Sequence, residues 1–184
     1  VAESWTVSDD GLVYTFNLRG DAKWSNGDPV TAGDFVYSLQ RIMTPVTGAK
    51  YANILYPIAN AEAVNKGEMD PSEMAVKAID DKTLEITLAK ATPFFIELLT
   101  HQTGLPVHPA TVDAHGADFV QPENMVSNGA YTLSANILND KIVLTKNANF
   151  HDAANVDIAE VNYLPFEDRA TCVRAWEAGE VHSC

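Results

Sequence analysis

The sequence predicts an α+β fold in which mixed sheets of hairpins are accompanied by short helices. Three pairs of short runs rich in β-branched and aromatic residues are each joined by turn-forming residues, which is typical of β-hairpins. The predicted helices stand singly among these hairpins and do not alternate strictly with strands, as a parallel sheet would require. The 184 residues, 46% of them hydrophobic, can bury the core of one domain, or of one domain and part of another.

The N-terminal stretch predicts a hairpin followed by a capped helix. Trp5–Val7 and Val13–Leu18 flank Ser8–Gly11, whose residues tolerate the left-handed backbone of a tight turn. Thr31 is suited to cap a helix that carries Asp34 in its first turn, near the positive end of the helix dipole. Apolar residues then recur at helical spacing and define its buried face: Phe35, Val36, Leu39, Ile42 and Met43.

The middle of the chain predicts a second hairpin between two short helices. Met74–Ile79 and Thr83–Leu88 flank the turn Asp80–Lys82, and a short helix over Asn60–Asn65 precedes them. Another helix is expected to begin at Thr92, followed by Pro93 at a position that suits a helix start. Its inward residues are expected to be Phe94, Phe95, Leu98 and Leu99.

The C-terminal stretch predicts a third hairpin and two more helices. Thr111–His115 reads as a short helix, and Ala130–Ile137 with Lys141–Lys146 as a hairpin. Val161–Leu164 is expected to be a strand, and Thr171–Ala178 a helix closed by a glycine.

The charge of the chain excludes some classes of partner. Twelve basic and 25 acidic residues give a formal net charge of −13, which argues against nucleic acid and anionic membranes because their phosphates repel it. No run approaches the roughly 20 apolar residues of a membrane span. The chain begins inside a folded pattern, without the basic and apolar regions of a signal peptide.

Several motifs resemble the signature of one protein family. AESW, DGLVYTFNLR and WSNGDPVTAGDFVYS follow one another in the order found in the family 5 extracellular solute-binding proteins. Later segments, among them VKAIDDKTLEITL, QPENMVSNGAY and VNYLPFEDRAT, are most similar to the oligopeptide-binding branch. The resemblance implies part of a type II periplasmic-binding-protein-like fold. It identifies residues 1–108 with the accessory domain and residues 109–184 with a truncated first ligand-binding lobe.

The resemblance also implies a function. Members of the family are the receptors of ABC importers, so the chain is expected to capture short peptides in a two-lobed cleft and deliver them to the permease subunits in the membrane. No cofactor is expected. Export to the periplasm or the outer face of the cell membrane is implied, with the signal upstream of this sequence. Tyr51 and His101 stand where the oligopeptide receptors contact their ligand, and they are the predicted ligand-binding residues.

Both residues have a structural alternative. Tyr51 is equally consistent with a half-buried aromatic residue whose hydroxyl is hydrogen-bonded. His101 is consistent with a histidine at a helix end that interacts with the helix dipole. His101, His108 and His115 are spaced seven apart, but the glycine and prolines between them break any helix that would align them as metal ligands.

Other residue groups suggest weaker alternatives. Cys172, Cys184 and His182 lie close enough in sequence to suggest a small Cys–His hydrolase, although no orienting group or oxyanion site is evident. Cys172 is instead expected either to form a disulfide with Cys184 or to pack inside a helix. Asp80 and Asp81 read as turn residues.

Two further expectations concern packing and assembly. Trp5 and Trp24 are expected to pack in a core rather than stack on a ligand. The chain is alternatively a structural or interaction fragment without peptide binding, and self-association would then cover its exposed apolar surface.

Overall fold

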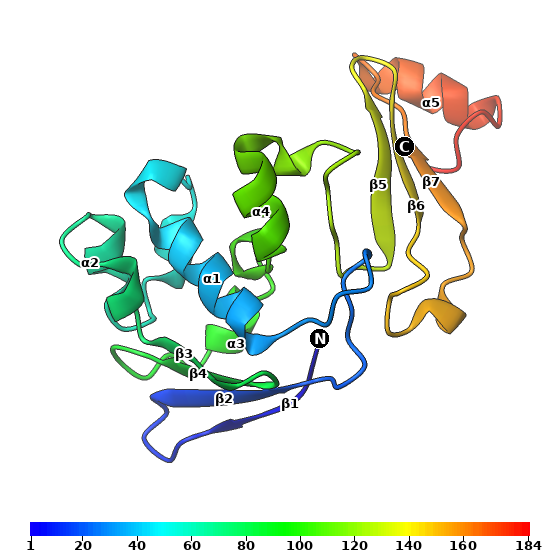
Figure 1. Ribbon diagram of the computed structural model, residues 1–184. Coiled ribbons are helices and arrows are strands. Elements are labelled where there is room, and N and C mark those ends of the chain that lie inside the picture. The colour runs from blue at the N-terminus through cyan, green and yellow to red at the C-terminus, as the bar shows by residue number, and fades with distance from the viewer.

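Two antiparallel sheets organise the computed structural model, which describes residues 1–184 (Figure 1). The first sheet has the strand order β1-β2-β4-β3. Its strands are β1 (Ala2–Val7), β2 (Val13–Leu18), β3 (Val76–Asp80) and β4 (Thr83–Thr87). The first two predicted hairpins are therefore confirmed. Strands β2 and β4 pair antiparallel and join the hairpins into one sheet, with Phe16 opposite Leu84.

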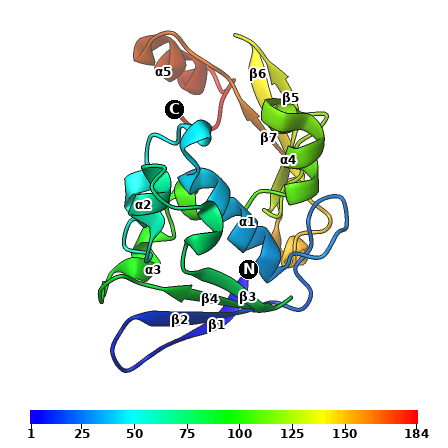
Figure 2. The same ribbon diagram turned by 60° about the vertical axis from the view of Figure 1, so that its left-hand side comes forward.

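Helix α1 (Ala32–Met43) lies against this sheet, as Figures 1 and 2 show. Its start is the predicted one. The hydroxyl of Thr31 accepts the N–H of Asp34, and the carboxylate of Asp34 accepts the N–H of Thr31, a reciprocal capping box. Leu39 and Met43 are buried in the core. The remaining predicted face residues pack against that core while partly buried: Phe35, Val36 and Ile42.

Two predictions of burial need correction. Trp24 is buried with 1% of its surface exposed, but Trp5 is 50% exposed. Trp5 is exposed because β1 is the edge strand at one end of the sheet, whereas α1 packs over β3 and β4 at the opposite end. The helix predicted to begin at Thr92 begins at Phe95 (α3, Phe95–Leu98), so Phe94 lies before its first residue and is 58% exposed.

Short helices fill the connections around α1. Helix α2 (Ala61–Asn65) confirms the helix predicted there. Four 3₁₀ turns also occur in this region: η1 (Pro45–Thr47), η2 (Ala52–Leu55), η3 (Pro71–Glu73) and η4 (Gln102–Gly104). Helix α4 (Pro109–His115) starts two residues before the predicted start, because His108 caps it and Pro109 occupies its first turn.

Helix α4 and the following η5 (Gly116–Val120) pack beside α1. The hydroxyl of Tyr37 on α1 donates to Asp113 on α4 at 2.8 Å. The backbone N–H of Val107 donates to the hydroxyl of Ser38 at 2.9 Å. We call residues 1–120 the first part of the chain. The domain division near residue 108 stays a prediction.

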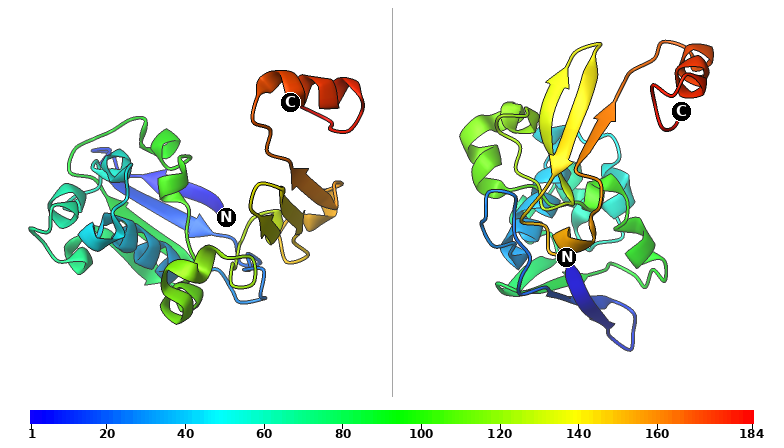
Figure 3. Two further views of the ribbon diagram at one scale, coloured as in Figure 1. Left: turned by 90° about the horizontal axis from the view of Figure 1, so that it is seen from above. Right: turned by 90° about the vertical axis from the view of Figure 1, so that its right-hand side faces the viewer.

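The second part, residues 129–184, carries the other sheet (Figure 3). Its strands β5 (Tyr131–Ile137), β6 (Lys141–Lys146) and β7 (Glu160–Tyr163) pair in sequence order. The 3₁₀ turn η6 (Ala153–Asn155) lies between β6 and β7, and α5 (Arg169–Glu177) follows β7. The third hairpin, the strand and the last helix are thus confirmed. Figure 3 shows this part projecting from the first. Only three of its residues are buried: Val143, Asn147 and Ala175. None of the helices is long and apolar enough to cross a bilayer.

Candidate ligand-binding site

The fold brings the two predicted ligand-binding residues together. Tyr51 immediately precedes η2 and His101 immediately precedes η4, and these two turns are in contact. The ring centroids of Tyr51 and His101 are 5.4 Å apart, with the planes inclined by 59°. Two residues far apart in sequence therefore form one aromatic pair at the surface. Whether that pair contacts a ligand stays a prediction.

The backbone around His101 determines what its ring can offer. Its Nδ1 accepts the N–H of Thr103 at 3.3 Å and so caps η4. An Nδ1 that accepts a hydrogen bond carries no proton, so in the neutral ring the proton is on Nε2. No group of the chain is hydrogen-bonded to Nε2. His101 thus sits at a helix end, as its structural alternative proposed, and still presents a free donor.

Tyr51 matches its structural alternative only in part, because its ring is about half-buried but its hydroxyl is not hydrogen-bonded within the chain. Its surface is 55% exposed, and its hydroxyl has no hydrogen-bond partner in the chain. A half-buried, hydrogen-bonded tyrosine would hold its hydroxyl inside the protein. The exposed ring and the free hydroxyl leave Tyr51 available to pack against, and hydrogen-bond to, another molecule.

A hollow of about 290 Å³ lies beside the pair. Besides Tyr51 it offers the ammonium group of Lys50 and the primary amide of Gln102, both able to donate hydrogen bonds to carbonyl or carboxylate oxygens. These groups and the apolar floor come from six residues: Ile42, Ala49, Lys50, Tyr51, Gln102 and Thr103. Donors grouped around an exposed aromatic ring are suited to binding a ligand with carbonyl or carboxylate oxygens.

Gly104 is a positioning feature that sequence reasoning treated only as a helix breaker. A Cβ at this position would lie 2.7 Å from the carbonyl oxygen of Leu99. Only glycine lets η4 fold this closely against the end of α3. Gly104 therefore holds the turn that His101 caps.

The other candidate residues serve local structure. His108 caps α4 and His115 lies in the last turn of α4, so the three evenly spaced histidines have separate surroundings. Asp80 accepts the N–H of Lys82 at 2.8 Å and the hydroxyl of Thr83 at 3.0 Å. The backbone hydrogen bond from Lys82, followed by the hydroxyl bond from Thr83, lowers the pKa of Asp80. It is a turn carboxylate, as expected.

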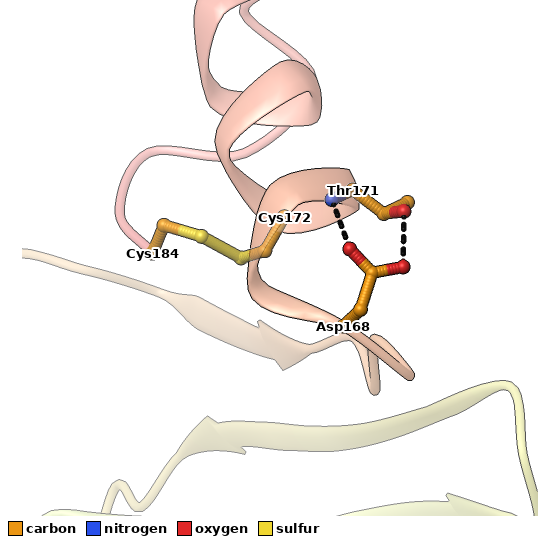
Figure 4. The surroundings of a disulfide bond; sticks show 4 residues. All are labelled: Asp168, Thr171, Cys172 and Cys184. Atoms are coloured by element: carbon orange, nitrogen blue, oxygen red, sulfur yellow. Dashed lines mark hydrogen bonds between the residues drawn. A yellow bond between two sulfur atoms is a disulfide. The ribbon is translucent and has the colours of Figure 1, made fainter.

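Cys172 and Cys184 form a disulfide, with Cα atoms 5.8 Å apart (Figure 4). Of the two expectations for Cys172, the disulfide is the one that the structure bears out. Neither sulfur is a free thiol, so the Cys–His hydrolase has no nucleophile in this state. Figure 4 also shows Asp168, which caps α5 by accepting the N–H of Thr171 at 2.8 Å.

This two-sheet arrangement, with a polar and aromatic hollow, is that of a solute-binding protein. OppA of Burkholderia pseudomallei matches it with a TM-score of 0.95 and 39% identity, over 98% of this chain and 36% of that structure. Haemophilus influenzae OppA in complex with RPPGFSPFR also gives a TM-score of 0.95 and 39% identity, over 98% and 36% of the two chains.

The sequence comparisons identify the family. The model of the family described as "Bacterial extracellular solute-binding proteins, family 5 Middle" matches residues 1–184. The chain belongs to this family. The periplasmic oligopeptide-binding protein OppA of Escherichia coli (strain K12) is 44% identical over 183 residues, which cover 98% of this chain and 34% of that protein. The chain thus spans about a third of the length of these relatives. The resemblance of the motifs and the α+β fold class are confirmed.

Proposed function

We propose that this chain is part of the substrate-binding component of a peptide ABC importer and helps to capture short peptides in a two-lobed cleft. The observation that carries the proposal is the Tyr51–His101 pair: the two rings pack together, and Tyr51 lines the hollow with Lys50 and Gln102. The relative in complex with the peptide RPPGFSPFR supports a peptide as the ligand class.

Recognition follows from the chemistry of the pair. A peptide backbone supplies a carbonyl oxygen at every residue, and Nε2–H of His101 can donate to one of them. The ring of Tyr51 supplies apolar contact that does not depend on one particular side chain. An extended peptide adds backbone hydrogen bonds to strand edges, which makes binding tolerant of sequence. The ligand is held without chemical change, so no cofactor takes part.

The remaining roles follow from the family. Residues 1–108 act as the accessory domain and residues 109–184 as part of the first ligand-binding lobe. Closure of the lobes around the peptide presents the loaded receptor to the permease subunits. This takes place in the periplasm or at the outer face of the membrane, and the word "periplasmic" in the name of the E. coli relative supports that location.

Calorimetric titration tests the proposal. Peptides of three to nine residues are titrated into the 184-residue chain and into the longer protein that contains it. Heat of binding to the longer protein, reduced by substitution of Tyr51 and His101, is the expected result. Peptide affinity that is unchanged by substitution of Tyr51 and His101 would refute the role of these residues. Absence of peptide binding by the longer protein would refute the proposed function.

A second candidate is that the 184 residues alone are an interaction unit without peptide binding. The small number of buried residues in the second part favours it. Exposed apolar side chains of that part would drive self-association: Ile137, Leu138, Tyr163, Leu164 and Trp176. Light scattering on a sizing column distinguishes a monomer from a dimer, and titration shows whether the isolated chain binds peptides.

A further inference from the structure

Ser25, in the loop between Trp24 and Asp28, is hydrogen-bonded both to the connecting segment and to the second part of the chain. The N–H of Ser25 donates to the carbonyl oxygen of Ser127 at 2.7 Å. The hydroxyl of Ser25 accepts the N–H of Ser127 at 3.1 Å. The carbonyl oxygen of Ser25 accepts a side-chain N–H of Asn149 at 2.9 Å. All three polar groups of this serine are therefore directed at residues outside the first part.

In the second part, Asn149 is held in place by hydrogen bonds of its neighbour Asn147. Asn147, only 3% exposed, is one of the few buried residues of the second part. Its side-chain amide donates to the carbonyl oxygen of Gly129 at 2.8 Å, and its side-chain oxygen accepts the N–H of Asn149 at 2.9 Å. Asn147 thus joins the loop that follows β6, which contains Asn149, to Gly129 just before β5.

The Ser25 side is held equally well. Trp24 is buried beside it, and the N–H of Trp24 donates to the carbonyl oxygen of Asp28 at 2.8 Å, which closes the loop. The carboxylate of Asp28 lies 3.1 Å from Nε2 of His108, and the His108 ring packs edge-on against Trp24 with centroids 5.3 Å apart. The loop is therefore fastened to the core and to the start of α4.

The other links between the two parts come from loops, such as the neighbouring charges of Arg19 and Asp152. The extensive packing between helices and strands is confined within each part. Figure 3 shows the β5–β7 sheet and α5 projecting away from the first sheet and α1. One apolar contact accompanies the serine, since Val126 of the connecting segment packs against the cluster that contains Trp24. Without further ties, the connecting segment would let the second sheet rotate.

We propose that Ser25 is a positioning residue that sets the angle of the second sheet relative to the first part. Two of its hydrogen bonds hold Ser127 in the connecting segment and the third holds Asn149 in the second part, so Ser25 attaches the loop after β6 and the segment before β5 to the same point. If the proposed function holds, this angle also sets how the Tyr51–His101 pair faces the lobe. The orientation itself is a property of the chain and can be measured without a peptide.

Distances between two spin labels test the proposal. Labels are placed at Glu68→Cys in the first part and Asp140→Cys in the second, both exposed positions. The variant Ser25→Ala with Asn149→Ala removes two of the three hydrogen bonds. The control, Ser4→Ala with Asn162→Ala, removes the same residue types from hydrogen bonds that lie within one part.

The expected result is a narrow distance distribution in the parent and in the control. The Ser25/Asn149 variant is expected to give a broader distribution, with other orientations populated roughly thirtyfold more, because two hydrogen bonds are lost. Ser25→Thr with Asn149 intact should restore the narrow distribution, because it retains the hydroxyl. An unchanged distribution in the Ser25/Asn149 variant, with thermal unfolding showing a folded chain, would overturn the proposal. Because no peptide is added, this outcome is independent of whether the chain binds peptides.

Discussion

The indole Nε1 of Trp24 donates a hydrogen bond of 2.9 Å to Oδ2 of Asp34. The same carboxylate oxygen accepts the N–H of Thr31 at 2.9 Å and so completes the cap of α1. One side chain therefore joins the start of the main helix to the buried tryptophan beside the Ser25 loop. This arrangement couples local helix capping to tertiary packing.

Asp34→Ala should destabilise the chain strongly. Loss of the cap removes about 1 kcal/mol, and leaving the buried indole N–H without a partner removes about another 1–3 kcal/mol. Urea unfolding followed by tryptophan fluorescence measures the change. Asp34→Asn retains an acceptor oxygen and should lose clearly less. Equal losses in the two variants would show that the hydrogen bond to Trp24 contributes little.

Tyr51→Phe and His101→Ala should weaken peptide binding by the longer protein. Tyr51→Phe removes one donor that the chain leaves unpaired, which corresponds to about 1 kcal/mol or roughly a fivefold rise in Kd. His101→Ala removes the Nε2 donor and also the cap of η4, so its loss is expected to be at least as large. Titration calorimetry measures the affinity. Tyr163→Phe is the matched control, because Tyr163 is 57% exposed and lies on β7. An affinity unchanged by both site variants would exclude the pair from the binding surface.

Gly104→Ala should destabilise η4 because the new Cβ would meet the carbonyl oxygen of Leu99 at 2.7 Å. The expected loss is about 1–3 kcal/mol, typical of forced overpacking. Gly20→Ala is the control, since a Cβ there meets nothing within 4 Å. Thermal unfolding of both variants measures the difference. A Gly104→Ala chain as stable as the control would show that η4 moves freely away from α3.

Asp168 makes the start of α5 dependent on pH. The backbone N–H of Thr171, and then its hydroxyl, hold the pKa of Asp168 below its usual value. A lowered folded-state pKa means that the stabilisation is present above the ordinary aspartate pKa of about 3.9 and disappears as the pH falls through the lowered value. Amide exchange of the α5 residues should accelerate over that range, while Asp168→Asn should show a smaller change. Identical acid profiles of the two chains would contradict this assignment.

Much of the secondary structure is determined locally and was predicted from sequence alone. Thr31 and Asp34 lie within one helical turn, so their reciprocal cap depends only on neighbouring residues. The hairpins follow from alternating runs and turn residues that are close in sequence. The family motifs likewise identified the class of protein. None of these features depends on contacts between residues that are distant in sequence.

Tertiary structure alone decided the rest. Trp5 and Trp24 are both predicted to pack in a core, yet only Trp24 is buried: Trp5 lies on the edge strand β1, whereas Trp24 packs in a separate cluster with Ala22 and Val30. The 5.4 Å pairing of Tyr51 with His101 and the hydrogen bonds of Ser25 join segments whose proximity is set by long-range packing. Periodicity and capping act over a few residues, whereas these contacts arise only when the whole core has closed.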